Sequence, residues 1–328
     1  MKKITLKKIK NKLWSKLVKF TFGKKLFAFI YKSYWHYLFT KSKELTSSLS
    51  YFTAMPNSGA GIGHQMANWI SGYWFAKQFG VAFAHSPFSS TQWEVFLGFG
   101  EDEIMLQKLI NKKGYKKVKL PLFDENNLKE LSLIQKIINS YKGKKVVFVC
   151  EQDQFYRDQF GVIKEIQQKF YNSPSRKEDK LLFDLNAYNI AIHVRRGDIV
   201  AGQNKIDNHT MRWMNNEYFL NTLQNTLDFI NTDKKICIYL FSQGKKEDFI
   251  EFEQFSNLIY CLDMGAIDSF LHMVYADVLI TSKSSFSYKP ALLNKGLKIV
   301  PTNFWHGYPS TNDWIQVNNE GMLLTYKT

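Results

Sequence analysis

Short apolar runs alternate with helical patterns along most of this chain, which is the arrangement that produces α/β folds. In the second half, continuous apolar segments recur at 189–194, 235–241, 257–262, 278–282 and 297–301. Because these runs do not alternate between apolar and polar positions, they predict strands buried on both faces, as in a parallel sheet. Helical patterns separate them at 214–230, 246–256, 266–276 and 287–295.

The first half follows the same pattern less regularly. Strand-like segments lie at 49–56, 81–85 and 146–150, and helical patterns at 64–79 and 127–139. Residues 172–180 are polar, contain Pro174 and interrupt the pattern, so they predict a domain boundary. A chain of 328 residues is long enough for two cores. We therefore predict two Rossmann-like α/β domains, 46–175 and 176–328, facing each other across a cleft.

A separate basic segment precedes them at residues 1–45. Thirteen lysines and no acid lie between Met1 and Lys43, and removing them from the formal charge of +15 leaves +2 for the rest. The positive charge therefore belongs to this segment and not to a basic face of the fold. No nucleic-acid-binding module accompanies the lysines, so the sequence predicts no nucleic-acid partner.

The same segment has the pattern of an amphipathic helix. Apolar residues recur three or four positions apart at Leu6, Ile9, Leu13, Leu17 and Phe20, and an aromatic-rich stretch follows at 27–39. Lysines opposite such a stripe suit a helix that lies on an anionic membrane surface. The alternative is a helix that packs this stripe on the first domain. Neither a transmembrane run nor a cleaved signal peptide is predicted.

Cysteine and histidine positions exclude several kinds of site. Cys150, Cys237 and Cys261 stand singly inside apolar runs, which predicts buried free thiols in a reducing compartment. No Cys/His cluster has the spacing of a metal site, and no G-x-S-x-G nucleophile elbow is present. We therefore expect no metal and no serine-hydrolase chemistry.

The sequence HVRRGD at 193–198 follows a predicted buried strand directly. In open α/β sheets, ligands bind at the carboxyl ends of the strands. Adjacent guanidinium groups at such a place, here Arg195 and Arg196, offer planar pairs of donors that suit a diphosphate. The alternative is a solvated pair of surface arginines.

A second motif, GAGIGHQ at 59–65, lies between a predicted strand and a predicted helix. Small residues let backbone N–H groups approach a ligand, and a helix N-terminus favours anions. The candidates here are Gly61, Gly63, His64 and Gln65. The motif is neither a Walker A loop nor a G-x-G-x-x-G fingerprint, so a tight structural turn is the alternative.

A third motif, TSKSSFS at 281–287, again joins a strand end to a helix. Its hydroxyl and N–H groups suit phosphate oxygens, with Ser284 and Ser285 as candidates, although serine at this place also caps helices. Asp268 lies one predicted helix earlier. It could accept hydrogen bonds from a guanine edge, or be a helix-face carboxylate in solvent.

Taken together, these residues resemble the fucosyltransferase superfamily, which includes bacterial α-1,2-, α-1,6- and protein O-fucosyltransferases. HVRRGD matches the superfamily's most diagnostic motif. SSFSY at 284–288 with ALLN at 291–294 resembles the SSFSWW segment of the bacterial α-1,2 enzymes, and 61–76 resembles their glycine-rich loop and helix. The resemblance covers about residues 50–315 and ends on a looser match, DWI at 313–315. The chain departs from the pattern at His64, where Asn is usual, and at Tyr288-Lys289, which replaces paired tryptophans.

The resemblance implies a GT-B-like fold, a GDP-sugar donor, inversion at the anomeric carbon and no metal cofactor. It implies catalytic roles for Arg195, Arg196 and Asp198, with one or both arginines on the β-phosphate, where fixed guanidinium groups stabilise the growing charge. It assigns donor binding to His193, Gly61, Gly63, His64, Gln65, Asp268, Ser284 and Ser285. The general base stays open among Asp198, Asp207 and His209.

The same analogy implies a role in surface polysaccharide synthesis, with a glycan or lipid-linked oligosaccharide as acceptor. It places the enzyme in the cytoplasm, peripherally bound to the inner face of the cell membrane through residues 1–43. Two alternatives remain: a transferase for another GDP-sugar, such as a heptose, and a non-catalytic, membrane-attached nucleotide- or glycan-binding protein. Acceptor contacts are expected in loops 86–100 and 199–213.

Overall fold

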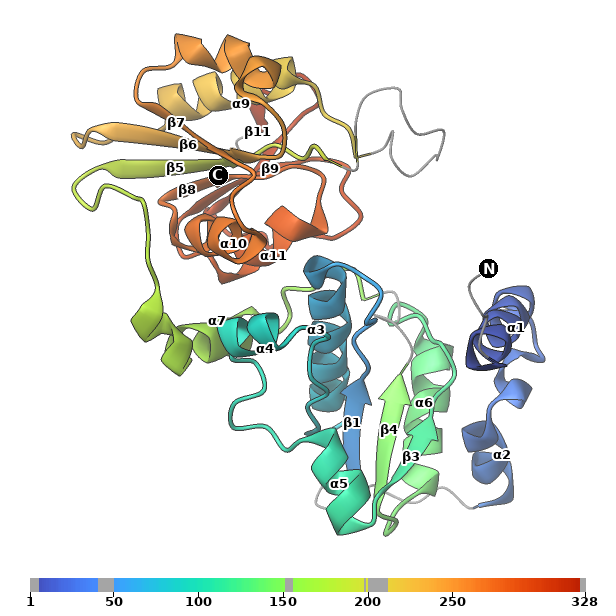
Figure 1. Cartoon of the computed structure of the whole chain (residues 1–328). Coiled ribbons are helices and arrows are strands. Elements are labelled where there is room, and N and C mark those ends of the chain that lie inside the picture. The colour runs from blue at the N-terminus through green and yellow to red at the C-terminus, as the bar shows by residue number, and fades with distance from the viewer. Residues whose placement is uncertain (1–5, 41–49, 151–155, 198, 200–211, 325–328) are drawn as a thin grey trace. The chain divides into compact units, whose positions relative to one another are not determined.

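The computed structural model describes residues 6–40, 50–150, 156–197, 199 and 212–324, which fold into two compact α/β units (Figure 1). Unit 1 comprises Met1–Asn57, Ala67–Pro87 and Asp102–Tyr156, and unit 2 comprises Ser58–Met66, Phe88–Glu101 and Arg157–Thr328. No helix among the described residues is long and apolar enough to cross a membrane. The predicted fold class, α/β with parallel sheets, is confirmed for each unit.

Unit 1 contains a parallel sheet in the strand order β2-β1-β4-β3. Its strands are β1 (Ser50–Ala54), β2 (Ala82–Phe83), β3 (Lys116–Lys119) and β4 (Val146–Cys150). Its helices include α5 (Leu106–Lys113), α6 (Leu128–Ser140) and most of α3 (Ile62–Gln78). The apolar pattern missed β3 because this edge strand has the sequence KKVK, in which Val118 is the one buried residue.

Unit 2 contains a seven-stranded sheet in the order β11-β10-β9-β8-β5-β6-β7. Its strands are β5 (Tyr188–His193), β6 (Ile236–Ser242), β7 (Leu258–Leu262), β8 (Val278–Ile280), β9 (Leu297–Pro301), β10 (Trp314–Val317) and β11 (Leu323–Leu324). All neighbours are parallel except β10 and β11. The central strand β5 is buried at every residue after Tyr188, as its continuous apolar sequence predicts.

The chain of unit 2 winds outward from β5 in two directions. It runs from β5 to β6 and β7, returns to β8 on the other side of β5, and continues to β9 and β10, which is the strand order of a Rossmann fold. Helix α9 (Asn216–Phe229) covers one face of the sheet, and α10 (Ala266–Tyr275) and α11 (Ser285–Leu293) cover the other (Figure 1). The order therefore reverses between β5 and β8.

Unit 2 begins earlier in the chain than the predicted boundary at 175–176. Helix α7 (Ile163–Asn172) is joined to α11, because Gln167 Nε2 donates to the carbonyl of Leu292 (3.0 Å) and Tyr171 Oη donates to that of Leu293 (3.1 Å). The 3₁₀-helix η3 (Pro174–Glu178) follows α7 directly. The polar residues at 172–180, most of which form η3, thus lie inside unit 2 and do not link the two units.

The N-terminal segment folds as α1 (Leu6–Thr21), η1 (Phe27–Ile30) and α2 (Lys32–Phe39) and belongs to unit 1. Val18, Phe27 and Tyr31 form a buried cluster with Leu122 against it. Helix α2 is held to α6 by His36, whose Nε2 lies 3.0 Å from the carbonyl oxygen of Ser140. The three predicted free cysteines are confirmed as buried thiols.

Candidate functional site

The HVRRGD motif follows the carboxyl end of β5, at the point where the strand order of unit 2 reverses. His193 is the last residue of β5 and pairs with Phe241 of β6, while Ile192 pairs with Ile280 at the end of β8. Because β5 and β8 are parallel, the loops that follow them leave the same edge of the sheet. Crevices at such switch points are the usual ligand sites of open α/β sheets.

His193 joins the two loops. Its Nδ1 lies 2.9 Å from Oγ of Ser282, which follows β8, and its ring contacts that of Phe286. Burial lowers the pKa of His193 to about 3, and the charges of Arg195 and Arg196 act in the same direction. The imidazole is therefore neutral at physiological pH and adds no positive charge to this edge.

Arg195 extends from the end of β5 to the start of α11. Its Nη1 donates a 2.9 Å hydrogen bond to Oγ of Ser284, which is the N-cap of α11 and also accepts from the backbone N–H of Phe286. A helix N-terminus carries partial positive charge, and a guanidinium placed beside it adds a full one. This arrangement favours an anion at the same place.

Arg196 is used differently from its neighbour. Its guanidinium donates to the carbonyls of Arg195 (2.9 Å) and Met214 (3.0 Å) and to Oδ1 of Asn216 (2.7 Å), and it lies 4.1 Å from the ring centroid of Trp213. Burial lowers its pKa to about 10, with Asp248 opposing the shift. Arg196 thus fixes the backbone of Arg195 to the segment that starts α9.

The glycine-rich motif reaches the same helix terminus from the other side. Gly63 lies in the first turn of α3, and a Cβ placed on it would be 2.7 Å from the backbone oxygen of Ser285. A Cβ on Gly61 would meet nothing within 4 Å. Only the second of these glycines is therefore required for the close approach of the N-termini of α3 and α11, and two converging helix N-termini strengthen an anion site.

Gln65 and His64 occupy different positions beside this loop. Gln65 is buried; its Nε2 donates to the carbonyl of Ala60 and to Oγ of Ser89, both at 2.8 Å, and its Oε1 accepts from the N–H of Ser89. It therefore ties the glycine loop to the predicted acceptor loop 86–100. His64 is exposed on the first turn of α3.

The remaining predicted residues are less closely connected. Asp268 is exposed on the first turn of α10, where a carboxylate also suits the positive end of the helix, so both alternatives for it stay open. Asp198, Asp207 and His209 lie outside the described residues, as does most of loop 199–213. Within the described ranges, no group of three or more His, Cys, Asp or Glu side chains could hold a metal ion.

Sequence reasoning missed His306, a single histidine in a segment without a motif. It is buried, stacks on Tyr288 at 4.7 Å, and holds the carbonyl of Arg157 with Nδ1 at 3.1 Å. Burial lowers its pKa to about 2 and the charge of Lys289 acts in the same direction, while the hydrogen bond to the carbonyl of Arg157 opposes the shift. Tyr288 and Lys289, the departures from the family pattern, are therefore interior residues beside this histidine.

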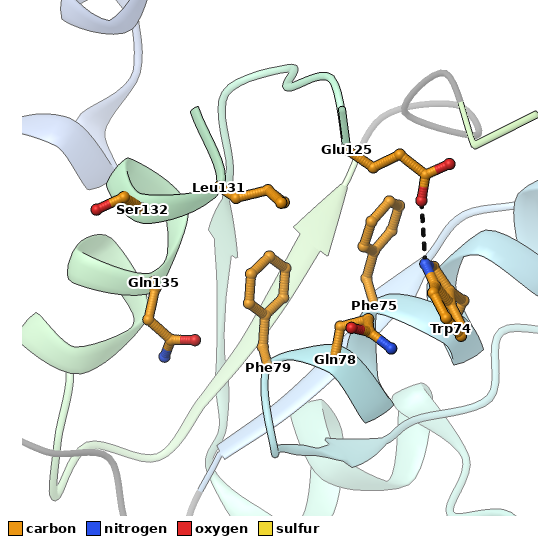
Figure 2. A pocket seen from close by; sticks show the side chains of 8 residues that line it. All are labelled: Trp74, Phe75, Gln78, Phe79, Glu125, Leu131, Ser132 and Gln135. Carbon is orange, nitrogen blue, oxygen red and sulfur yellow. Dashed lines mark hydrogen bonds between the residues drawn. The ribbon is translucent and has the colours of Figure 1, made fainter. Parts of the chain in front are cut away.

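Unit 1 contains a pocket of about 390 Å³ between α3 and α6 (Figure 2). Phe75, Phe79 and Leu131 line it, and Trp74 at one side donates a hydrogen bond to Oε2 of Glu125 (3.2 Å). None of the predicted site residues lines this pocket. His193, Arg195 and Ser284 lie instead at the edge of the sheet in unit 2.

No family model and no curated protein matches the sequence. Among solved structures, the chain is similar to the fucosyltransferase NodZ from Bradyrhizobium, with 12% identity and a TM-score of 0.46 over 76% of this chain and 93% of that one. It is similar to NodZ α-1,6-fucosyltransferase co-crystallized with GDP, with 11% identity and a TM-score of 0.45 over 85% of this chain and 98% of that one. It is also similar to POFUT1 in complex with GDP, with 12% identity and a TM-score of 0.42 over 77% of this chain and 97% of that one.

Proposed function

We propose that this chain is a glycosyltransferase that moves fucose, or a related sugar, from a GDP-sugar to a glycan hydroxyl, with inversion and without a metal. The linkage proposed is α-1,2-like, on the resemblance of SSFSY to the bacterial enzymes of that type. The proposal depends on one observation above all. Arg195 is bonded to the N-cap of α11, at the sheet's switch point and beside the N-terminus of α3.

The electrostatics of this edge support a diphosphate ligand. Arg195 contributes a full positive charge, α3 and α11 contribute the partial charges of their N-termini, and His193 is neutral and adds none. A nucleoside diphosphate has the matching negative charge, and its oxygens are the acceptors that a guanidinium fork binds best.

In the proposed reaction, an acceptor hydroxyl attacks the anomeric carbon while the bond from that carbon to the β-phosphate oxygen breaks. The electron pair of that bond stays on the departing GDP, so negative charge grows on its β-phosphate. A guanidinium that is already held in place stabilises this charge more in the transition state than in the ground state. Asp198, Asp207 and His209 remain the candidates for the base that takes the hydroxyl proton.

The proposal includes a cellular location and a class of acceptor. We place the enzyme in the cytoplasm at the inner face of the cell membrane, where it builds surface polysaccharide on a glycan or lipid-linked oligosaccharide. Residues 1–43, with thirteen lysines and no acid, are the proposed contact to the anionic surface.

A panel of nucleotides and nucleotide sugars in a thermal-shift assay tests the donor. A ligand that binds only the folded state raises Tm, and at equal concentration a tighter ligand raises it more, so GDP and its sugars should shift Tm where UDP, ADP and CDP do not. GDP release in the presence of candidate acceptors then tests the reaction. Equal shifts by all nucleotides, or none by any, would contradict the proposal.

The same panel separates the alternatives. A larger shift with a GDP-heptose than with GDP-fucose would favour a transferase for that sugar. The departures from the family pattern at His64 and at Tyr288-Lys289 leave room for it. Tight GDP binding with neither sugar transfer nor donor hydrolysis would favour a non-catalytic binding protein.

A further inference from the structure

Helix α1 has two apolar faces, and only one of them packs on the protein. Trp14 is half-buried and Val18 buried, in the cluster with Phe27 and Tyr31. The second face is the five-residue stripe of Leu6, Ile9, Leu13, Leu17 and Phe20, called the outer stripe below. Trp14 and Val18 each follow a residue of the outer stripe by one position, which is about 100° around a helix. The packed face and the outer stripe therefore point in different directions.

All five residues of the outer stripe are exposed. Leu6 is 76% exposed, Leu13 63% and Phe20 70%, and Ile9 and Leu17 are above 40%. Helix α2 adds exposed Trp35 and Phe39 to the same N-terminal segment. Single exposed apolar residues are ordinary, but five in one row along a helix form the kind of surface that marks an interaction site.

A row of lysines runs beside the outer stripe. Four exposed lysines each precede a stripe residue by one position: Lys8, Lys12, Lys16 and Lys19. They therefore lie on the side of the stripe opposite to Trp14 and Val18. Lys24 adds a cation at the far end of the stripe, 3.6 Å from the ring centroid of Phe20.

From this geometry we propose that α1 docks on an anionic lipid bilayer through the outer stripe while its packed face stays attached to unit 1. The stripe enters the boundary between headgroups and acyl chains, and the lysine row lies among the headgroups. Each lysine near such a surface strengthens binding about fivefold. The inference gives a docking face to the membrane contact included in the proposed function and rests on it for its biological meaning.

Charge and shape together favour a bilayer over a macromolecular partner. A nucleic acid would use the lysines but leave the five apolar residues in water. An acidic protein would need an apolar groove along the full length of α1, with carboxylates on one side only. A bilayer has an apolar interior for the outer stripe and anionic headgroups for the lysine row beside it.

Sedimentation of the full chain with lipid vesicles tests the docking face. We expect binding to vesicles that contain phosphatidylglycerol, much weaker binding to pure phosphatidylcholine, and release when salt rises from about 0.1 M to about 1 M, because the screening length falls from about 10 to about 3 Å. Leu13→Gln with Leu17→Gln should weaken partition at least about tenfold. Because both residues are exposed, the Tm of this variant should stay that of the wild type.

Two controls isolate the surface. Replacing exposed lysines elsewhere in unit 1, Lys112, Lys113 and Lys129, with Gln removes the same kind of charge away from α1 and should leave vesicle binding unchanged. GDP release with soluble substrates should be unaffected by L13Q/L17Q, which keeps docking distinguishable from catalysis. The proposal fails if the wild type ignores anionic vesicles, if L13Q/L17Q binds like the wild type, or if a nucleic acid or the chain itself occupies the stripe instead.

Discussion

The backbone oxygen of Ser285 lies 2.7 Å from the position that a Cβ on Gly63 would occupy, so the first turns of α3 and α11 are in direct contact. Ser285 is the first residue of α11, and its N-cap Ser284 is the acceptor for Arg195. The glycine-rich motif, the serine-rich motif and the arginine pair are thus joined at one point within unit 2. Residues of the same motif should therefore respond differently to substitution, as we expect of Gly61 and Gly63 in the glycine-rich motif.

The two glycines of the loop should differ sharply on substitution by alanine. Gly63→Ala forces the new methyl group against the Ser285 backbone, and we expect a loss of about 1–3 kcal/mol in the free energy of unfolding, as for other overpacked sites. GDP affinity should fall with it, because the two helix N-termini separate.

Gly61→Ala is the matched control, since its methyl group meets nothing within 4 Å. It should change the free energy of unfolding by no more than about 0.5 kcal/mol. Chemical denaturation and GDP titration of the two variants check both expectations. Equal behaviour of the two would show that the approach of α3 to α11 does not matter.

Arg195 should carry transition-state stabilisation with little effect on folding. Removing one preorganised donor of this kind costs about 10²–10³ in rate, so Arg195→Ala should lose at least that much in a direct GDP-release assay. Arg195→Lys should recover little of it, because an ammonium lacks the planar fork that binds two phosphate oxygens. Turnover near that of the wild type in either variant would remove the main support for the proposed function.

Arg196→Ala should also lose at least about 10²–10³ in rate, but with a fall in stability that Arg195→Ala does not show. The substitution leaves the carbonyls of Arg195 and Met214 and the amide of Asn216 without their charged donor. Hydrogen bonds to charged groups are worth about 1.5–3 kcal/mol each, so Tm should fall by several degrees. Thermal unfolding of both alanine variants separates the two roles.

Normal Tm together with lost turnover in Arg196→Ala would mean instead that this guanidinium acts on the donor directly. GDP titration then distinguishes a direct contact between Arg196 and the donor from a role in positioning Arg195. A positioning residue should weaken GDP binding through Arg195, so a double variant of Arg195 and Arg196 should lose little more than Arg195→Ala alone.

The sequence predicts where the strands of this site end, but it does not predict that Arg195 and Arg196 have different roles. Continuous apolar runs identify β5 and β8 because strands buried on both faces need no polar positions. The functions of Arg195 and Arg196 cannot be separated by the same means. What distinguishes them is the position of Met214 and Asn216, which the fold brings to Arg196 across 18 and 20 residues of chain.

The N-terminal helix illustrates a second limit of pattern reading. Its apolar spacing predicts the outer stripe correctly as one face, but periodicity does not say which face meets protein. Trp14 and Val18 are only two residues, but they form the face of α1 that packs on the protein. They do so because Phe27 and Tyr31, which follow α1 in the chain, lie in the same cluster. A pattern measures amphipathicity, whereas packing depends on what the rest of the chain places opposite.

Acid should destabilise the protein through its buried histidines. The pKa of His193 is about 3 in the folded state, against about 6.5 in an unfolded chain. Above about pH 6.5 both states are neutral and the contribution to stability is complete. As the pH falls from there toward 3, the unfolded state takes up the proton first, and the free energy of unfolding decreases by up to about 1.4 kcal/mol per pH unit. His306, with a pKa of about 2, acts in the same direction.

Urea denaturation between about pH 7 and pH 5.5 measures this slope before most carboxylates titrate. We expect His193→Gln, which keeps a polar group for Ser282, to remove about half of the histidine slope, and a second substitution at His306 to remove most of the rest. A wild-type stability that stays constant to pH 5.5 would mean that His193 accepts a proton in the folded protein and adds positive charge to the edge of the sheet.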